Sequence, residues 1–272
     1  DRDGGKPDVL KTFAEEQGLP VHQPKSWKTD EAAQLMQSFE PDICMMAYVT
    51  LMVPQNVLDI PTHGTFQYHP SLLPEHRGPS SINWPIIMGK TRTGLSIFWP
   101  DEGLDEGPIL LQKEVEIKPD DTLGSLYFNS LFPMGVDAML EALELVKSGK
   151  ASRIEQDDSK ATYESWCKKP DAEIDWNKPA SEVYNLIRGC DPQPGAWSQL
   201  NGEEIKIFDS RLSVDGSGSP GEIIEISGDQ LSVACSEGSI QILRVRPQGQ
   251  GKLSTSEWVE AGGVETGKRF GS

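Results

Sequence analysis

The continuous apolar run from Ile43 to Val49 restricts the fold of this chain more than any other feature of its sequence. A strand that is apolar at every position has to be covered on both faces, which is typical of a sheet with helices packed on each side. Helix-like and strand-like segments alternate on either side of this run as far as residue 150. Alternation of this kind favours an α/β fold with a mostly parallel sheet.

Capping and breaking residues predict where the individual elements begin and end. We expect a short helix over Asp8–Gln17, ended by Gly18, and a second helix capped by Thr29 or Asp30 that continues through Phe39. The further expected elements are a helical turn at 54–58, strands at 64–69, 94–99 and 109–117, a helix at 80–88, and a long helix capped by Asp121 or Thr122, kinked by Pro133, reaching Lys147 and ended near Gly149.

The composition of the chain changes after residue 150. Residues 151–175 are charged and irregular, as expected of a linker, and a helix-like stretch follows at 180–188. Short apolar runs then recur at about ten-residue spacing between glycines and prolines, which is typical of a small barrel or sandwich. These runs are 205–208, 223–226, 231–234 and 240–243. We therefore expect two domains, 1–150 and 176–272, joined by the linker 151–175.

Charge and cysteine content narrow the classes of function. The net charge is −17, and residues 176–272 hold 13 acidic against 9 basic residues, so neither domain resembles a nucleic-acid platform. The cysteines at 44, 167, 190 and 235 form no Cys-x-x-Cys pair, which favours a reducing compartment and predicts a cytoplasmic protein without a zinc site. No apolar run is long enough for a membrane helix, and the first residues do not form a secretory signal peptide.

Chemistry-bearing residues are densest between Gln67 and Gly78. His69 closes an expected strand, and Gln67 lies two residues earlier on the same face. A histidine and a carboxamide side by side can supply a proton donor and an oxyanion ligand. The alternative is a strand-end histidine that is hydrogen-bonded to a neighbouring backbone group.

The acidic loop from Asp101 to Gly107 is a second cluster, with four carboxylates and two glycines between two expected strands. It can place a carboxylate against His69, or it can be a solvated turn. The ligand spacing of a calcium loop is missing. Neither a Gly-x-Ser-x-Gly elbow nor a phosphate-binding glycine loop is present in the sequence.

Taken together, these stretches resemble the 10-formyltetrahydrofolate-dependent formyltransferase family. The carrying motif is Gln67-Tyr68-His69 followed by Pro-Ser-Leu-Leu-Pro and Arg77-Gly78, with Asp105 lying 36 residues after His69. The residues of these motifs are most similar to those of the hydrolase domains of 10-formyltetrahydrofolate dehydrogenases. Methionyl-tRNA formyltransferases share the two-domain plan. Residues 174–176, 187–189 and 194–197 resemble the entry to the family's C-terminal barrel. The family normally begins with a strand and helix that would precede Asp1.

The resemblance implies a Rossmann-like formyltransferase sheet, an OB-like C-terminal barrel, and 10-formyltetrahydrofolate as formyl donor without a metal. His69 and Gln67 would stabilise the oxyanion of a tetrahedral intermediate, and Asp105 would keep His69 cationic or accept a proton through water. The folate ring is expected against Tyr48, Leu51, Leu72, Leu73 and Pro74, with backbone groups of Glu102, Gly103 and Leu104 at its polar edge.

Two departures from the family affect the acceptor and the rate. Most formyltransferases have Asn where this chain has Gln67, whose amide sits one methylene further out. The acidic charge disfavours tRNA as acceptor. Three functions remain open: transfer of the formyl group to water or a small amine, methionyl-tRNA formylation, and folate binding with impaired catalysis. We expect folate as partner and no membrane association.

Overall fold

The computed structural model describes residues 8–47, 49, 51–262 and 264–271. The chain divides into two compact units, the first made of residues 1–44 and 48–65 and the second of residues 45–47 and 66–272. Within the apolar run that starts at Ile43, the strand is shorter than expected and covers Cys44–Met46 (β1).

Helices of the first unit begin close to the predicted positions. Helix α1 spans Val9–Glu16, and the Asp8 carboxylate accepts hydrogen bonds from backbone N–H groups of its first turn. Helix α2 spans Asp30–Ser38 and is capped by the Thr29 hydroxyl. A short helix α3, Gln55–Leu58, follows at the expected position. These side chains pair N–H groups that have no partner inside the helix, which is why the caps are readable from sequence.

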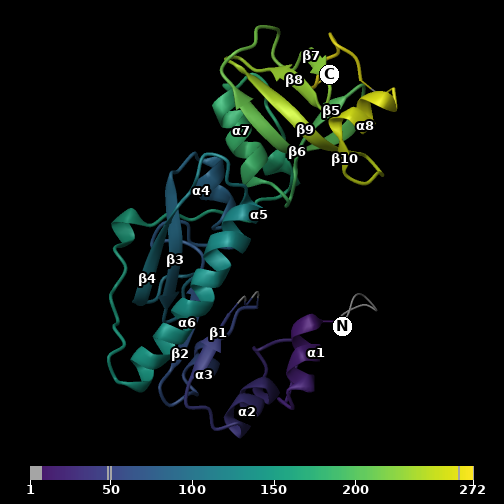
Figure 1. Ribbon diagram of the computed structural model, residues 1–272. Coiled ribbons are helices and arrows are strands. Elements are labelled where there is room, and N and C mark those ends of the chain that lie inside the picture. The colour runs from purple at the N-terminus through teal and green to yellow at the C-terminus, as the bar shows by residue number, and fades with distance from the viewer. Residues whose placement is uncertain (1–7, 48, 50, 263, 272) are drawn as a thin grey trace. The chain divides into compact units, whose positions relative to one another are not determined.

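The described residues before the C-terminal part of the chain form a four-stranded sheet in the order β1-β2-β3-β4. Strand β2 covers Thr65–His69, β3 covers Arg92–Phe98, and β4 covers Ile109–Glu116. Helix α4, Asn83–Ile87, lies between β2 and β3 in sequence. The predicted α/β class is confirmed, and strands and helices alternate as expected through α4 (Figure 1).

The expected parallel arrangement does not extend to β2, β3 and β4, because both β2–β3 and β3–β4 pair antiparallel. The β3–β4 connection is the acidic loop, which contains no helix. A parallel pair needs a crossover of a dozen or more residues, whereas a short loop returns the chain in the opposite direction. The acidic loop therefore lies at the end of the sheet where β3 finishes, and the register of β2 against β3 pairs His69 with Ser96.

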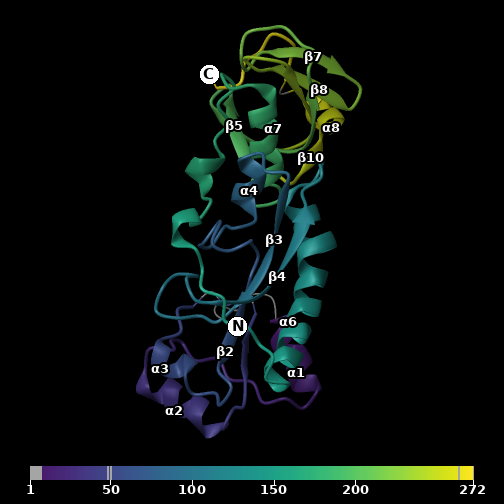
Figure 2. The same ribbon diagram turned by 90° about the vertical axis from the view of Figure 1, so that its left-hand side faces the viewer.

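A long helical segment runs alongside β3 and β4 (Figures 1 and 2). It consists of α5, Leu123–Leu126, a π-helical turn, Tyr127–Leu131, and α6, Phe132–Lys147. Thr122 caps its start, and Gly149 follows its end in a left-handed conformation, as predicted. The irregularity expected at Pro133 is the π turn, since proline cannot donate the backbone hydrogen bond that a regular helix needs there.

The C-terminal part begins with α7, Ala180–Gly189, and continues as a six-stranded antiparallel sheet in the order β5-β6-β9-β8-β7, with β10 beside β9. The segment at 267–271 hydrogen-bonds to Gln199 of β5 and to Ile223 of β7, so it joins the two ends of the sheet. The expected barrel is thereby confirmed. Its remaining elements are β5 Ala196–Leu200, β6 Glu203–Ser213, β7 Ile223–Ser227, β8 Gln230–Ala234, β9 Ser239–Pro247, β10 Leu253–Ser254 and α8 Thr255–Glu260.

The segment that links α6 to α7 follows the four-stranded sheet rather than leaving it (Figure 2). Ile154 forms a bridge with Ile109 of β4, and Tyr163 forms a parallel bridge with Arg77. We call residues 161–167 the strap, because their hydrogen bonds hold the loop that follows β2. Among the described residues, no helix is both long enough and apolar enough to cross a bilayer.

Candidate active site

His69 occupies the last position of β2 and is 5% exposed. Its Nε2 atom lies 2.9 Å from the backbone oxygen of His76. A carbonyl oxygen can only accept, so Nε2 carries a proton and donates it to His76. The backbone contact considered at the sequence level is therefore real, and it anchors one ring nitrogen while leaving Nδ1 for another partner.

Asp105 supplies that partner from the acidic loop. Its Oδ2 atom lies 3.6 Å from His69 Nδ1, and both side chains are almost fully buried. Because Nε2 already holds a proton, attraction between Nδ1 and the carboxylate requires a second proton between them. The geometry thus fits a histidine–carboxylate pair in a site largely withdrawn from solvent, where electrostatic interactions are strong.

One three-residue segment, His76–Gly78, holds both members of this pair. The oxygen of His76 accepts from His69, and the N–H of Gly78 donates to Asp105 Oδ2 at 2.9 Å. His76 and Asp105 both adopt left-handed backbone conformations, each with φ 58°. Such conformations persist in non-glycine residues when the surrounding structure determines them. The separation of His69 and Asp105 is therefore set by a shared backbone scaffold.

The strap fixes this scaffold from outside. Thr162 O accepts from Arg77 N at 3.0 Å, and Thr162 Oγ1 accepts from His76 N at 2.8 Å. Glu164 N donates to Arg77 O at 3.2 Å. The Glu164 carboxylate also lies 3.1 Å from His76 Nδ1, and both groups are buried. The strap therefore holds the segment that positions the pair at His76 and at Arg77.

We predict that Gly78→Ala is much more destabilising than an ordinary glycine substitution. Gly78 has φ +106°, and a Cβ atom there would lie 2.5 Å from the backbone oxygen of Glu164. Backbone strain costs about 1–2 kcal/mol for a residue forced into the left-handed region, and the collision with the strap adds to it. Denaturant unfolding should show a loss of about 3 kcal/mol or more.

Gly149→Ala is the matched control for this prediction. Gly149 also has a positive φ, +67°, but a Cβ atom added there would meet no other atom within 4 Å. Its loss should be limited to the backbone strain of about 1–2 kcal/mol. Equal losses of unfolding free energy in the two variants would show that the strap moves away from the added methyl group at no energetic cost.

Arg77 ties the scaffold to the acidic loop and is 1% exposed. Its guanidinium donates to Gln156 Oε1 at 2.9 Å and to Asp158 at 2.8 Å, and it also contacts the Tyr163 hydroxyl. Burial acts against the charge, but the hydrogen bonds to Asp158 and Tyr163 raise the pKa of Arg77. Gln156 in turn donates to Asp105 O at 2.9 Å, so one amide connects Arg77 to the backbone of the acidic loop.

Gln67 lies on the same strand face as His69 and pairs across the sheet with Phe98. Its side chain is half-buried and makes no hydrogen bond to any other described residue. An amide in this position can donate to a bound oxygen atom without breaking an existing bond. The structure therefore brings Gln67, His69 and Asp105 to one end of the sheet, as the sequence predicted.

The residues expected around a folate ring have different surroundings. Tyr48 lies outside the described residues, and Leu51 belongs to the first unit and is half-buried. Leu72 and Pro74 are half-buried in the loop after His69. Leu73 is 3% exposed and packs in a core cluster with Phe98 and Ile109. A contact of the folate ring with Leu72, Leu73 or Pro74 stays a prediction.

Residues of the acidic loop differ in how much they expose. Glu102 and Leu104 are exposed, and Gly103 is half-buried. The N–H of Gly103 donates to the Asp101 carboxylate at 2.9 Å, so this donor is used within the loop. The predicted contacts of these residues with a ligand stay predictions.

Two positioning residues were not found by sequence reasoning. Ser96 of β3 accepts a hydrogen bond from Leu73 N at 3.0 Å and donates to Ser71 O at 2.7 Å. Gln112 of β4 pairs with Ser96 in the sheet register and donates to both Ser96 Oγ and Leu73 O, each at 2.8 Å. Polar residues inside otherwise apolar strands were the available signal, since buried polar groups need partners.

Comparison with known proteins matches both parts of the chain. The family model described as formyl transferase matches residues 4–143, and that of the formyl transferase C-terminal domain matches residues 167–262. A mitochondrial 10-formyltetrahydrofolate dehydrogenase from Homo sapiens is 44% identical over 84% of this chain and 25% of that protein. A methionyl-tRNA formyltransferase from Geotalea daltonii is 36% identical over 97% of this chain and 84% of that protein. The chain thus spans about a quarter of the length of the dehydrogenase relatives.

Solved structures share the fold at lower identity. The crystal structure of HypX from Aquifex aeolicus in complex with tetrahydrofolic acid matches 89% of this chain and 41% of that chain, with a TM-score of 0.68 and 22% identity. The structure of WlaRD, a sugar 3N-formyl transferase, matches 89% of this chain and 82% of that chain, with a TM-score of 0.66 and 18% identity. At these identities the likeness is one of fold.

Proposed function

Because this chain belongs to the formyl transferase family, we propose that it moves the formyl group of 10-formyltetrahydrofolate to water or a small acceptor. The resemblance read from Gln67–Gly78 and the acidic loop is confirmed by these relatives, which include both groups that the sequence suggested. The observation that carries the proposal is the buried pair of His69 and Asp105, with the amide of Gln67 on the same strand face as His69.

The reaction requires attack on the formyl carbon, a tetrahedral intermediate with a developing oxyanion, and cleavage of the bond between that carbon and the folate nitrogen. The hydrogen bond from His69 Nε2 to His76 O supports a role for the other nitrogen, Nδ1, at the substrate. At 3.6 Å the contact with Asp105 is too long for a strong hydrogen bond, so a proton on Nδ1 can be donated to a substrate oxygen that lies beside the two groups. Gln67 would donate to the same oxyanion from the strand.

Asp105 is proposed to hold the positive charge on His69 and to accept the proton of the attacking group through water. When the carbon–nitrogen bond breaks, that proton passes to the folate nitrogen, so the site returns to its starting charge. An anion beside the imidazole favours the cation that the oxyanion needs. Both tasks depend on the carboxylate being charged, and its accepted bond from Gly78 supports that form.

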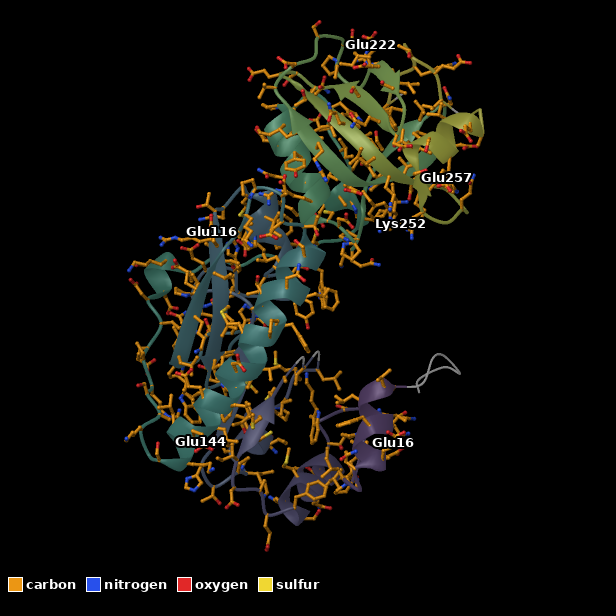
Figure 3. The ribbon with its side chains drawn as sticks, in the orientation of Figure 1. Glu16, Glu116, Glu144, Glu222, Lys252 and Glu257 are labelled. Atoms are coloured by element: carbon orange, nitrogen blue, oxygen red, sulfur yellow. The ribbon has the colours of Figure 1, made fainter. Side chains whose placement is uncertain are left out.

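The proposed function and its main alternative differ in the molecule that accepts the formyl group. Water or a small amine fits the overall charge of −17, and Figure 3 shows Glu116, Glu144, Glu222 and Glu257 spread over the catalytic half and the barrel. Methionyl-tRNA is the alternative, favoured by the relative that matches nearly the whole chain. The dehydrogenase relatives extend far beyond this match, so no dehydrogenase activity is proposed.

The deciding experiment is the acceptor profile of the purified chain. Tetrahydrofolate and formate are measured after addition of 10-formyltetrahydrofolate alone, with small amines, or with methionyl-tRNA. We expect turnover without tRNA and tRNA binding that collapses as salt rises, because phosphate contacts release counterions. Turnover that depends on methionyl-tRNA would establish the alternative, and binding of folate without product in a single turnover would establish a binding module.

We predict that Gln67→Asn retains activity and changes kcat by less than about tenfold. Asparagine keeps an amide donor on the strand face but withdraws it by one methylene, and a displacement near 1 Å can cost up to about a hundredfold when geometry is tight. Gln67→Leu removes the donor and should lower kcat by roughly 10²-fold while KM changes little. Equal rates for Gln67→Leu and the unsubstituted chain would remove Gln67 from the mechanism.

The division of the chain also belongs to this proposal. We propose a catalytic domain at 1–150, a linker at 151–175 and a barrel at 176–272, supported by one family match that ends before the linker and another that begins within it. The cytoplasmic location stays a prediction, since the dehydrogenase relatives include mitochondrial and cytosolic proteins by name.

A further inference from the structure

Two cysteines that have no part in the proposed chemistry lie side by side where the strap meets the barrel. Cys167 is the last residue of the strap and is half-buried, and Cys190 follows α7 and is fully buried. Their sulfur atoms are 3.9 Å apart, and all four cysteines of the chain are free thiols. A disulfide bond is about 2 Å long, so closing this gap takes a movement of roughly 2 Å.

Cys190 is fixed more firmly by its surroundings than Cys167. Cys190 N donates to Leu186 O and Ile187 O at the end of α7, and its side chain lies in the barrel core. Cys167 belongs to no helix or strand and is held through its N–H, which donates to Ser80 Oγ at 2.9 Å. Cys167 is therefore the partner that moves, and it carries the end of the strap with it.

The two thiols also differ in reactivity. The hydrogen bond from Cys190 lowers the pKa of Cys167 despite its partial burial, whereas the same bond together with burial raises the pKa of Cys190. Burial raises the pKa of both Cys44 and Cys235, the latter to about 12. The thiolate is the reactive form of cysteine, so Cys167 is the thiol that an oxidant should meet first.

We propose that Cys167 and Cys190 form a thiol–disulfide modification site whose oxidation by a small disulfide, such as oxidised glutathione, pulls the strap away from the catalytic loop. In the first step the Cys167 thiolate attacks one sulfur of the small disulfide and releases one thiolate. In the second step the Cys190 sulfur attacks Cys167, the mixed disulfide breaks, and the Cys190 proton passes to the second leaving thiolate. Two protein thiols and one small disulfide thus give one protein disulfide and two small thiols.

The strap connects this site to the catalytic pair. Ser165 O accepts from Trp84 Nε1 at 2.8 Å, and Glu164 and Thr162 hold the backbone of His76–Gly78. A shift of Cys167 therefore acts on the segment that spaces His69 and Asp105. Displacements near 1 Å at such sites can cost about a hundredfold in rate, so we expect turnover to fall on the order of tenfold or more. This effect on turnover rests on the proposed function, whereas formation of the bridge does not.

The test treats the full 272-residue chain with oxidised and reduced glutathione at set ratios, followed by acid quenching, alkylation and peptide mass mapping. We expect loss of two thiols together and a linked peptide joining Cys167 to Cys190, reversed by dithiothreitol. Cys44→Ser, which removes a half-buried thiol outside the strap and the barrel, is the matched control and should form the same bridge. Cys167→Ser should form none. Cys167 is the residue substituted in this test because it is half-buried, whereas Cys190→Ser would place a hydroxyl in the core.

Two results would overturn the site: glutathione that stays on Cys167 while Cys190 is alkylated, or four alkylated thiols at strongly oxidising ratios. Turnover of 10-formyltetrahydrofolate is measured on the same samples. Recovery of the lost rate on reduction in the unsubstituted chain, with no loss in Cys167→Ser, supports the link to the catalytic loop. A complete bridge with an unchanged rate would refute that link. A reduced protein without turnover would count against the proposed function and leave the bridge measurement unaffected.

Discussion

Turnover of 10-formyltetrahydrofolate should fall by roughly 10³-fold or more when His69 is replaced by alanine. The imidazole is proposed to stabilise the oxyanion and to move a proton, and each of these contributions is typically worth about 10²-fold or more. The measurement is kcat for formate or tetrahydrofolate release under saturating donor. We expect KM to change much less, because the interaction is made mainly in the transition state.

Stability of the His69→Ala protein decides how this loss is interpreted. The substitution leaves His76 O without its donor in a buried place, which costs about 1–3 kcal/mol and should lower Tm without abolishing folding. Circular dichroism and thermal unfolding provide that check. His63→Ala removes an exposed histidine and should leave both rate and Tm unchanged. A folded His69→Ala protein with full activity would exclude His69 from catalysis.

The second large effect is expected for Asp105→Asn, with kcat reduced roughly 10²-fold or more. Asparagine is nearly the same shape, still accepts the hydrogen bond from Gly78 N, and tolerates the left-handed backbone that Asp105 adopts. What it removes is the negative charge beside His69. The loss of rate therefore measures the electrostatic role of the carboxylate rather than its structural role, and the free energy of unfolding should change by less than about 1 kcal/mol.

Asp101→Asn is the matched control for this variant. Asp101 lies in the same acidic loop, is exposed, and accepts from Gly103 N, a bond that asparagine can also accept. Its rate should stay unchanged. Combining Asp105→Asn with His69→Ala should lower kcat little further than His69→Ala alone, because the two side chains act as one unit. An unchanged rate for Asp105→Asn would mean that the acidic loop is a solvated turn.

Much of the candidate site is local in sequence, and this explains why it was predictable. Gln67 and His69 share a strand face by the two-residue period of a strand, and the acidic loop starts where an apolar strand ends. The caps Thr29 and Thr122 were readable for the same reason, since each satisfies a backbone group three residues away.

The strap and its partners were not predictable, because they depend on contacts between residues about 80 positions apart. Residues 151–175 have the composition of a linker. The local sequence does not distinguish a solvated linker from one whose backbone hydrogen-bonds to a distant loop. The packing of Leu73 against Phe98 and Ile109 was not predictable either, since it depends on side chains from two strands.

The sequence by itself determined the α/β class, the C-terminal barrel, most element boundaries and the placing of Gln67 and His69 on one strand face, because these follow from periodicity and capping, whereas the pairing of Asp105 with His69 was implied only by the family resemblance. Tertiary structure alone decided the antiparallel pairing of β2, β3 and β4, the nitrogen of His69 that is anchored, and the meeting of Cys167 with Cys190. Each of these depends on distances between segments that local propensities do not encode, and only packing of the whole chain sets them.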